Sequence, residues 1–156
     1  MIRIYPGDLL RITACERFYY ALVFDKVSMF GGQLCFVYHR TSSEPLTANE
    51  VLDGPRDGFH QVIDFIWAKR EKRVERIATK LDVAAENSAI RFLKTTFTTQ
   101  GKAKEWWIRD REGNDIKRVT KLTSEEARYP LHECIDDTIM IGLVDQRWSP
   151  EKDPSI

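Results

Sequence analysis

Short apolar runs separated by turn-forming residues make up the first part of the chain. Residues 9–13, 18–25 and 33–39 are rich in branched and aromatic side chains, a composition typical of β-strands. The connection between the first two runs is short, so we expect them to pair as a hairpin. Residues 34–38 are almost entirely apolar, which predicts a strand in the centre of the sheet.

The period of the pattern changes in the middle of the chain. Between residues 59 and 67 the odd-numbered positions are the more consistently apolar, which predicts a strand that turns them to the core. Apolar residues then recur at helical spacing, which predicts a helix over residues 68–79 with a basic outer face. Residues 83–90 favour a helix that Asn and Ser could break. Residues 91–99 and 138–145 are expected to be strands.

A tryptophan pair, Trp106 and Trp107, opens the most informative stretch. Two short apolar-bearing runs flank a polar segment that contains Gly113 and Asn114, and both residues tolerate positive φ. The stretch therefore predicts a β-hairpin. Neighbouring side chains on a strand point to opposite faces, so we expect one tryptophan in the core and the other at an edge or under a helix.

Two capping boxes predict short helices. Thr123 is followed three residues later by Glu126, which predicts a helix that starts after residue 122 and ends before Pro130. Thr47 and Glu50 have the same spacing, so we expect one helical turn near residues 48–52.

The tryptophan hairpin and its capping box resemble a known family signature. Residues 106–126 are similar to the C-terminal part of the immunity protein 26 family of bacterial polymorphic toxin systems. Residues 6–12, Pro-Gly-Asp-Leu-Leu-Arg-Ile, and residues 20–23 resemble its start. The two blocks cover about a third of the chain, whereas residues 57–101 depart from the family pattern. The resemblance implies a protein that binds and neutralises a cognate toxin without catalysis.

The order of the elements indicates the fold class. Many short strands with few helices predict an α+β protein, with a curved antiparallel sheet or half-open β-barrel and one or two helices packed on one side. A chain of 156 residues is long enough for one domain with its own core. We expect that domain over residues 1–147, followed by a frayed tail over residues 148–156.

Composition narrows the function classes. Lys and Arg number 24 and Asp and Glu number 24, and a net charge of zero argues against a dedicated nucleic-acid binder without excluding a local basic patch. No run approaches the roughly 20 apolar residues of a membrane-spanning helix, and the N-terminus has no signal segment. We therefore expect a cytoplasmic protein with three reduced cysteines.

Catalytic and metal-binding signals are weak. The three histidines, His39, His60 and His132, have no ligand spacing, so we expect no metal site. Asp136 and Asp137 form a carboxylate pair that could bind a cation, but such pairs more often lie in a solvated turn. The sequence predicts no catalytic residue, no cofactor and no small-molecule substrate.

Two charged stretches are the candidate partner surfaces. The loop after the third strand carries acidic residues suited to a basic toxin, and the predicted basic helix is the second choice for an acidic toxin. The first set is Glu44, Glu50, Asp53 and Asp57, and the second is Lys69, Arg70, Lys72, Arg73 and Arg76. The alternative function is an SH3-like-barrel nucleic-acid-binding module or endoribonuclease, for which no acid–base pair is evident.

Overall fold

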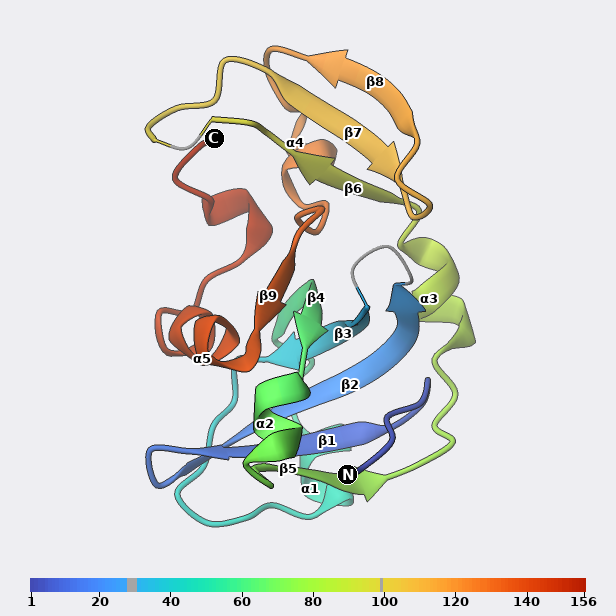
Figure 1. Cartoon of the computed structure of the whole chain (residues 1–156), viewed down its shortest axis with the longest axis vertical. Helices are drawn as coiled ribbons and strands as arrows, with labels where there is room; N and C mark the ends of the chain where they lie inside the picture. Colours follow the sequence, from blue (N-terminus) through green and yellow to red (C-terminus); the bar gives the residue numbers. More distant parts are fainter. Residues whose placement is uncertain (28–30, 99) are drawn as a thin grey trace.

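The computed structural model describes residues 1–27, 31–98 and 100–156 and shows an α+β protein with two sheets (Figure 1). The described strands are β1 (Leu9–Ala14), β2 (Arg17–Val27), β3 (Gly32–Tyr38), β4 (Gly58–Asp64), β5 (Val74–Ala78), β6 (Phe92–Thr95), β7 (Trp106–Asp110), β8 (Asp115–Val119) and β9 (Cys134–Asp136). The described helices are α1 (Ala48–Leu52), α2 (Ile66–Arg70), α3 (Ala84–Ala89), α4 (Ser124–Ala127), α5 (Asp137–Asp145) and the 3-10 turn η1 (Pro150–Lys152). Among the described residues, no helix has the length and hydrophobicity needed to cross a membrane.

The larger sheet has six strands in the order β5-β1-β2-β3-β4-β9. The predicted hairpin of the first two strands is confirmed, with Leu9 paired to Leu22 and Ala14 paired to Arg17. Neighbouring strands are antiparallel except for β4 and β9, which run parallel. The α+β class and the curved, open form of the sheet are therefore confirmed, whereas the parallel edge strand β9 makes the sheet mixed where an antiparallel one was expected. It is strongly twisted, so β9 crosses the direction of β1 in Figure 1.

Helices cover both faces of this sheet, whereas one covered side was expected. Ala68 of α2 and Met140 of α5 are buried against one face, and Val51 of α1 is buried against the other. The strands between them consequently bury both sets of alternating side chains, such as Tyr19 and Tyr20 on β2. Burial on both faces explains why the central strands are continuously apolar.

The smaller sheet contains the predicted tryptophan hairpin. Its order is β6-β7-β8, and the turn between β7 and β8 places Gly113 at φ +89°. Trp106 and Ile108 are buried while Trp107 is half-buried, which confirms that the two tryptophans lie on opposite faces. The sequence predicted the hairpin but not that it would belong to a second sheet.

The helix predicted over residues 68–79 is wrong. Helix α2 ends at Arg70, Lys72 has a positive φ of 57°, and the chain then returns as β5, which pairs with β1. Pairing with the open edge of the sheet provides hydrogen-bond partners for the backbone N–H and C=O groups of residues 74–78. These hydrogen bonds outweigh the helical spacing of the side chains. Trp67, which was expected in the core, is 53% exposed on α2.

The last strand predicted over residues 138–145 is also wrong. This segment is the helix α5, whose N-cap Asp136 accepts a hydrogen bond from the backbone N–H of Ile139 at 2.9 Å. The N-cap outweighs the β-branched composition that suggested a strand. The strand predicted over residues 91–99 is shorter, ending at Thr95, and residue 99 lies outside the described residues.

The C-terminal segment is packed against the protein, whereas a frayed tail was expected. Trp148 is only 8% exposed, and its carbonyl oxygen lies 2.6 Å from Nε2 of His39. Further along, the carbonyl oxygen of Ser155 accepts a hydrogen bond from the N–H of Ala103 at 2.7 Å. The polar composition of the tail concealed these contacts.

The two capping boxes are confirmed, because Thr47 and Glu50 cap α1 and Thr123 and Glu126 cap α4 with both reciprocal bonds present. Residues 83–90, for which helix and break were both considered, contain the helix α3. Local capping chemistry was therefore the most reliable signal for the short helices.

We predict that the two neighbouring tryptophans contribute very differently to stability. Trp106→Ala should lower the free energy of unfolding by about 3–5 kcal/mol, because it leaves a cavity in the core under the small sheet. Trp107→Ala should cost less than about 1.5 kcal/mol, because its ring is half-buried on the outer face. Urea denaturation of both variants measures the difference, and equal losses would contradict this arrangement.

We also predict that His60 makes the protein sensitive to mild acid. The ring lies 5.4 Å from that of Phe24 and 5.1 Å from that of Phe36, and burial lowers the pKa of His60 from 6.5 to about 4. Between these values the unfolded chain binds more protons than the folded one, so stability is lost as pH falls. From pH 7 to pH 4.5 the contribution is about 2–3 kcal/mol.

The control for this prediction is His60→Leu, which keeps an apolar side chain between the two aromatic rings. Urea denaturation at pH 7 and at pH 4.5 gives the loss of stability for each protein. The variant should lose less stability than the wild type over this interval. The same loss in both proteins would show that other groups cause the acid sensitivity.

Candidate functional site

The acidic loop uses two of its four carboxylates inside the protein. Glu50 accepts a hydrogen bond from the N–H of Thr47 at 2.7 Å as part of the α1 cap, and this bonding holds the pKa of Glu50 below its usual value. Asp57 lies 2.5 Å from the guanidinium of Arg147 and 3.2 Å from Nδ1 of His39. Both carboxylates therefore help to fix the loop and the C-terminal segment.

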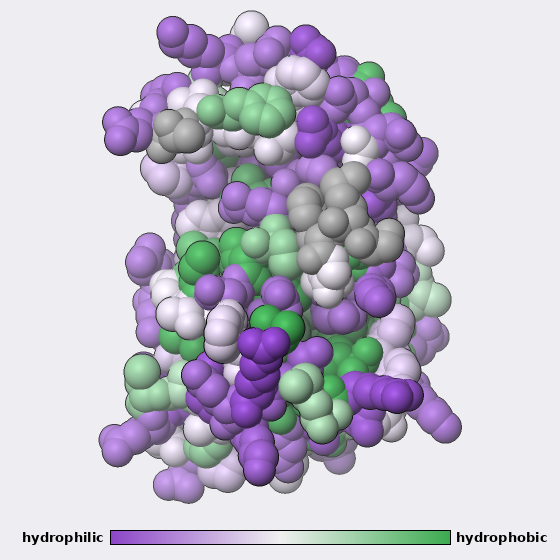
Figure 2. Space-filling view, viewed as in Figure 1, coloured by the Kyte–Doolittle hydropathy of each residue, from purple (hydrophilic) through white to green (hydrophobic). Residues whose placement is uncertain are grey.

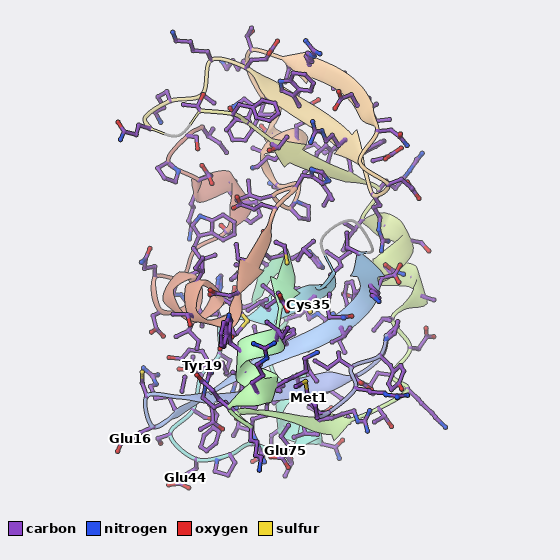
Figure 3. All side chains as sticks on the ribbon, in the orientation of Figure 1. Met1, Glu16, Tyr19, Cys35, Glu44 and Glu75 are labelled. Atoms are coloured by element: carbon purple, nitrogen blue, oxygen red, sulfur yellow. The ribbon has the colours of Figure 1, made fainter. Side chains whose placement is uncertain are left out.

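The other two acidic residues face solvent. Asp53 is the exposed C-cap of α1, and Glu44 is exposed in the loop that precedes this helix. Figure 3 shows Glu44 at the end of the molecule farthest from the small sheet. The acidic loop thus offers two free carboxylates to a partner instead of four.

The five basic residues of the second candidate set are not on one helix face. Arg73 follows the turn after α2 and binds Glu71 at 2.5 Å and the fully buried Asp137 at 2.8 Å. Arg76 lies on β5 and contacts the buried carboxylate of Asp8 at 3.5 Å. These two arginines hold the turn and the edge strand in place, so they are structural.

The remaining three cations of that set stay available at the surface. Within the described ranges, Lys69, Arg70 and Lys72 take part in no ion pair. They surround a hollow of about 430 Å³ whose apolar wall comes from the N-terminal residues and β5. We call this hollow the N-terminal groove, and it is lined by Met1, Ile2, Lys69, Arg70, Lys72 and Val74.

Exposed apolar side chains extend the groove along α2. The guanidinium of Arg70 lies 5.1 Å from the ring centroid of Trp67, which is 53% exposed, and the neighbouring Ile66 is 36% exposed. Met1 is 82% exposed and lies beside α2 in Figure 3. On this face Figure 2 shows strongly hydrophilic side chains next to hydrophobic ones. The groove therefore combines unpaired positive charge with uncovered apolar surface.

Sequence reasoning identified the basic residues of this groove and missed its apolar part. Trp67 was assigned to the core because it continued the alternation of β4, and residues 2–5 were considered as a short first strand, where the structure has no strand. Only the return of β5 along β1 brings the N-terminal residues next to α2. Exposed tryptophan and arginine side chains are enriched at protein-binding surfaces.

A second pocket lies between the small sheet and the C-terminal segment. Its volume is about 170 Å³, and Lys94, Thr96, His132 and Glu133 are among its lining residues. Lys94 is completely buried, and its Nζ donates hydrogen bonds to the carbonyl oxygens of Ala127 and, at 2.8 Å, Pro150. Burial lowers the pKa of Lys94 to about 8. Because its ammonium already binds two backbone oxygens, we interpret Lys94 as a structural cation.

The residues considered for metal binding or acid–base chemistry do not come together. His39 binds the carbonyl of Trp148, and His60 lies between two aromatic rings. Asp136 caps α5 while Asp137 binds Arg73, so the carboxylate pair has two structural roles. In the part of the chain that the structure describes, no group of three His, Cys, Asp or Glu residues could hold a metal ion.

The cysteines are free thiols. Cys35 is fully buried, and burial raises its pKa far above the ordinary thiol value; burial also raises the pKa of Cys134 to about 11. A raised pKa keeps a thiol protonated and unreactive at neutral pH. The candidate functional site that we consider further is the N-terminal groove with the exposed face of α2. Comparisons with protein-family models, curated proteins and solved structures found no match.

Proposed function

We propose that this chain is a cytoplasmic immunity protein that neutralises a toxin by binding it through the N-terminal groove. The observation that carries the proposal is one hollow at which exposed apolar side chains meet three cations that form no ion pair with any described residue. Such a surface suits a partner that presents acidic groups around an apolar side chain. The toxin class comes from the resemblance of residues 6–12, 20–23 and 106–126 to the immunity protein 26 family.

The charge of the groove favours an acidic contact surface on the toxin. Lys69 and Lys72 are available to meet carboxylates, and the ring of Trp67 can anchor the contact beside Arg70. Tryptophan and arginine are the side chains most often found at the energetic centre of protein interfaces. The acidic loop ranks second, because its Glu50 and Asp57 are already bonded within the protein.

We predict that reversing the groove charges slows toxin binding. The double variant Lys69→Glu, Lys72→Glu should lower the association rate by roughly tenfold, because these exposed charges steer the approach of an acidic surface. Trp67→Ala should raise the dissociation constant by about thirtyfold, as expected when an interface anchor is removed. The measurement is surface plasmon resonance with the C-terminal domain of a candidate toxin chosen from the reading frames next to this gene, together with survival of cells that express that domain.

The matched control is Lys104→Glu, Lys121→Glu, which makes the same charge change at exposed positions next to the small sheet. Its binding to the toxin should equal that of the wild type. If the wild-type chain neither binds nor protects against this toxin, the immunity proposal fails. If it protects and the groove variants do so equally well, the function stands and the contact surface lies elsewhere.

A further inference from the structure

The balanced net charge conceals a strong separation of charge along the chain. Residues 91–122, which contain all three strands of the small sheet, carry nine Lys and Arg against four Asp and Glu. The rest of the chain carries fifteen basic and twenty acidic residues. The small sheet forms one end of the molecule, opposite the N-terminus and β5 (Figure 1). Three of these cations are not available at the surface, because Lys94 is buried, Arg111 binds Asp25 and Lys117 binds Glu126. The cations that remain, among them Arg118, Lys104 and Lys121, still leave this end a positive excess that attracts polyanions.

Aromatic rings and arginines lie together on the outer face of the small sheet. The rings of Phe97 and Trp107 meet edge to face with centroids 5.3 Å apart. Cζ of Arg118 lies 3.6 Å from the centroid of Trp107, and Cζ of Arg109 lies 5.5 Å from it. We call these four residues the aromatic platform. Trp107 and Arg118 are cross-strand partners, so the register itself brings them to one face.

Further cations lie at the same end of the hairpin. Trp106 at the start of β7 pairs with Val119 at the end of β8. Lys104 lies two residues before Trp106, and Lys121 lies two residues after Val119. Both lysines therefore flank the end of the hairpin that carries Trp107. Both lysines are exposed. They add positive charge at the end of the hairpin opposite the turn that contains Gly113.

The core does not require this arrangement. Trp106 and Ile108 supply the buried face of β7, whereas Phe97 remains 69% exposed. Within the described part of the chain, Arg118 makes no ion pair, while Arg109 binds Asp115 at 2.8 Å. A surface cation–π pair stabilises a fold only slightly. The exposed ring and the unpaired guanidinium are therefore available to a ligand.

The chemistry of the platform fits a single-stranded nucleic acid better than a protein. Proteins that bind single strands combine aromatic rings, on which bases stack, with a positive surface that follows the phosphates. A protein anchor residue would need an apolar hollow to enter. The hollow at the platform end of β6 is lined mainly by polar residues, such as Thr95, Thr96 and Thr98, whereas the hollow with apolar residues such as Ile90 and Phe92 lies at the other end of this strand.

We propose that the aromatic platform binds single-stranded nucleic acid. Bases stack on the exposed ring of Phe97 and beside Trp107, and phosphate oxygens accept hydrogen bonds from Arg118 and from the flanking Lys104 and Lys121. The stacked guanidinium of Arg118 keeps N–H groups at its edge free to donate. Stacking and phosphate contacts do not distinguish one base from another, so the binding has little sequence preference.

The test is fluorescence anisotropy with a labelled 12-nucleotide uridine RNA, a matched thymidine DNA and a 12-base-pair DNA duplex. The full chain should bind both single strands more tightly than the duplex. Binding should weaken with salt, with a slope of about −0.7 for each phosphate contact. A preference between the two single strands identifies RNA or DNA as the natural source of the ligand.

The platform variants separate stacking from charge. Phe97→Ala and Trp107→Ala should each weaken binding by roughly 5- to 100-fold and leave the salt slope unchanged. The double variant Lys104→Glu, Lys121→Glu should weaken binding and make the salt slope shallower. Lys69→Glu, Lys72→Glu in the distant groove is the matched control and should bind RNA and DNA like the wild type.

Three outcomes would overturn this proposal. The first is no binding of either single strand by the wild-type chain at 100 µM protein and low salt, on the order of 50 mM. The second is binding that Phe97→Ala and Trp107→Ala leave unchanged. The third is loss of toxin binding in these variants without any affinity for nucleic acid, which would assign the platform to a protein partner. Because the groove variants address the toxin separately, failure of either proposal leaves the other testable.

Discussion

A buried ammonium group ties the small sheet to α4 and to the C-terminal segment. The side chain of Lys94 joins β6 to α4 through the carbonyl of Ala127 and to the C-terminal segment through that of Pro150. Its backbone N–H and C=O bind residues 130 and 132, and this segment continues into β9 at the edge of the large sheet. Removing either acceptor would leave a buried cation short of partners, which costs several kcal/mol. The position of the small sheet is therefore tied to these few acceptors.

The inward direction of Lys94 also determines what the small sheet presents to solvent. Lys94 is paired with Ile108, and both side chains share the buried face of the sheet. Thr95, which follows Lys94, and Trp107, which precedes Ile108, must then point to the other face. The aromatic platform is thus the reverse side of the contact that joins the two sheets. The N-terminal groove depends on another buried charge, because Arg73 binds Asp137 and fixes the turn between α2 and β5.

Local chemistry let the sequence predict about half of this fold. The first three strands, the tryptophan hairpin and both capped helices follow from alternation, turn residues and capping boxes. The segments that failed depend on distant partners. Residues 74–78 are a strand because the edge of β1 is open to them, and residues 138–145 are a helix that packs Met140 and Val144 against the large sheet. Both segments depend on contacts with residues that are distant in the sequence, and a short stretch of sequence does not reveal such contacts.

The candidate surfaces were harder to predict than the helices and strands. Only those charges that have no partner within the protein are available to a ligand, and the sequence does not show which charges these are. The acidic loop and the basic stretch were visible in the sequence, yet ion pairs and caps remove Glu50, Asp57, Arg73 and Arg76 from the available charge. What remains is positive at the groove and at the small sheet. A total charge of zero is therefore compatible with two positive binding surfaces in different parts of one molecule, because the opposite charges lie elsewhere on its surface or are paired within it.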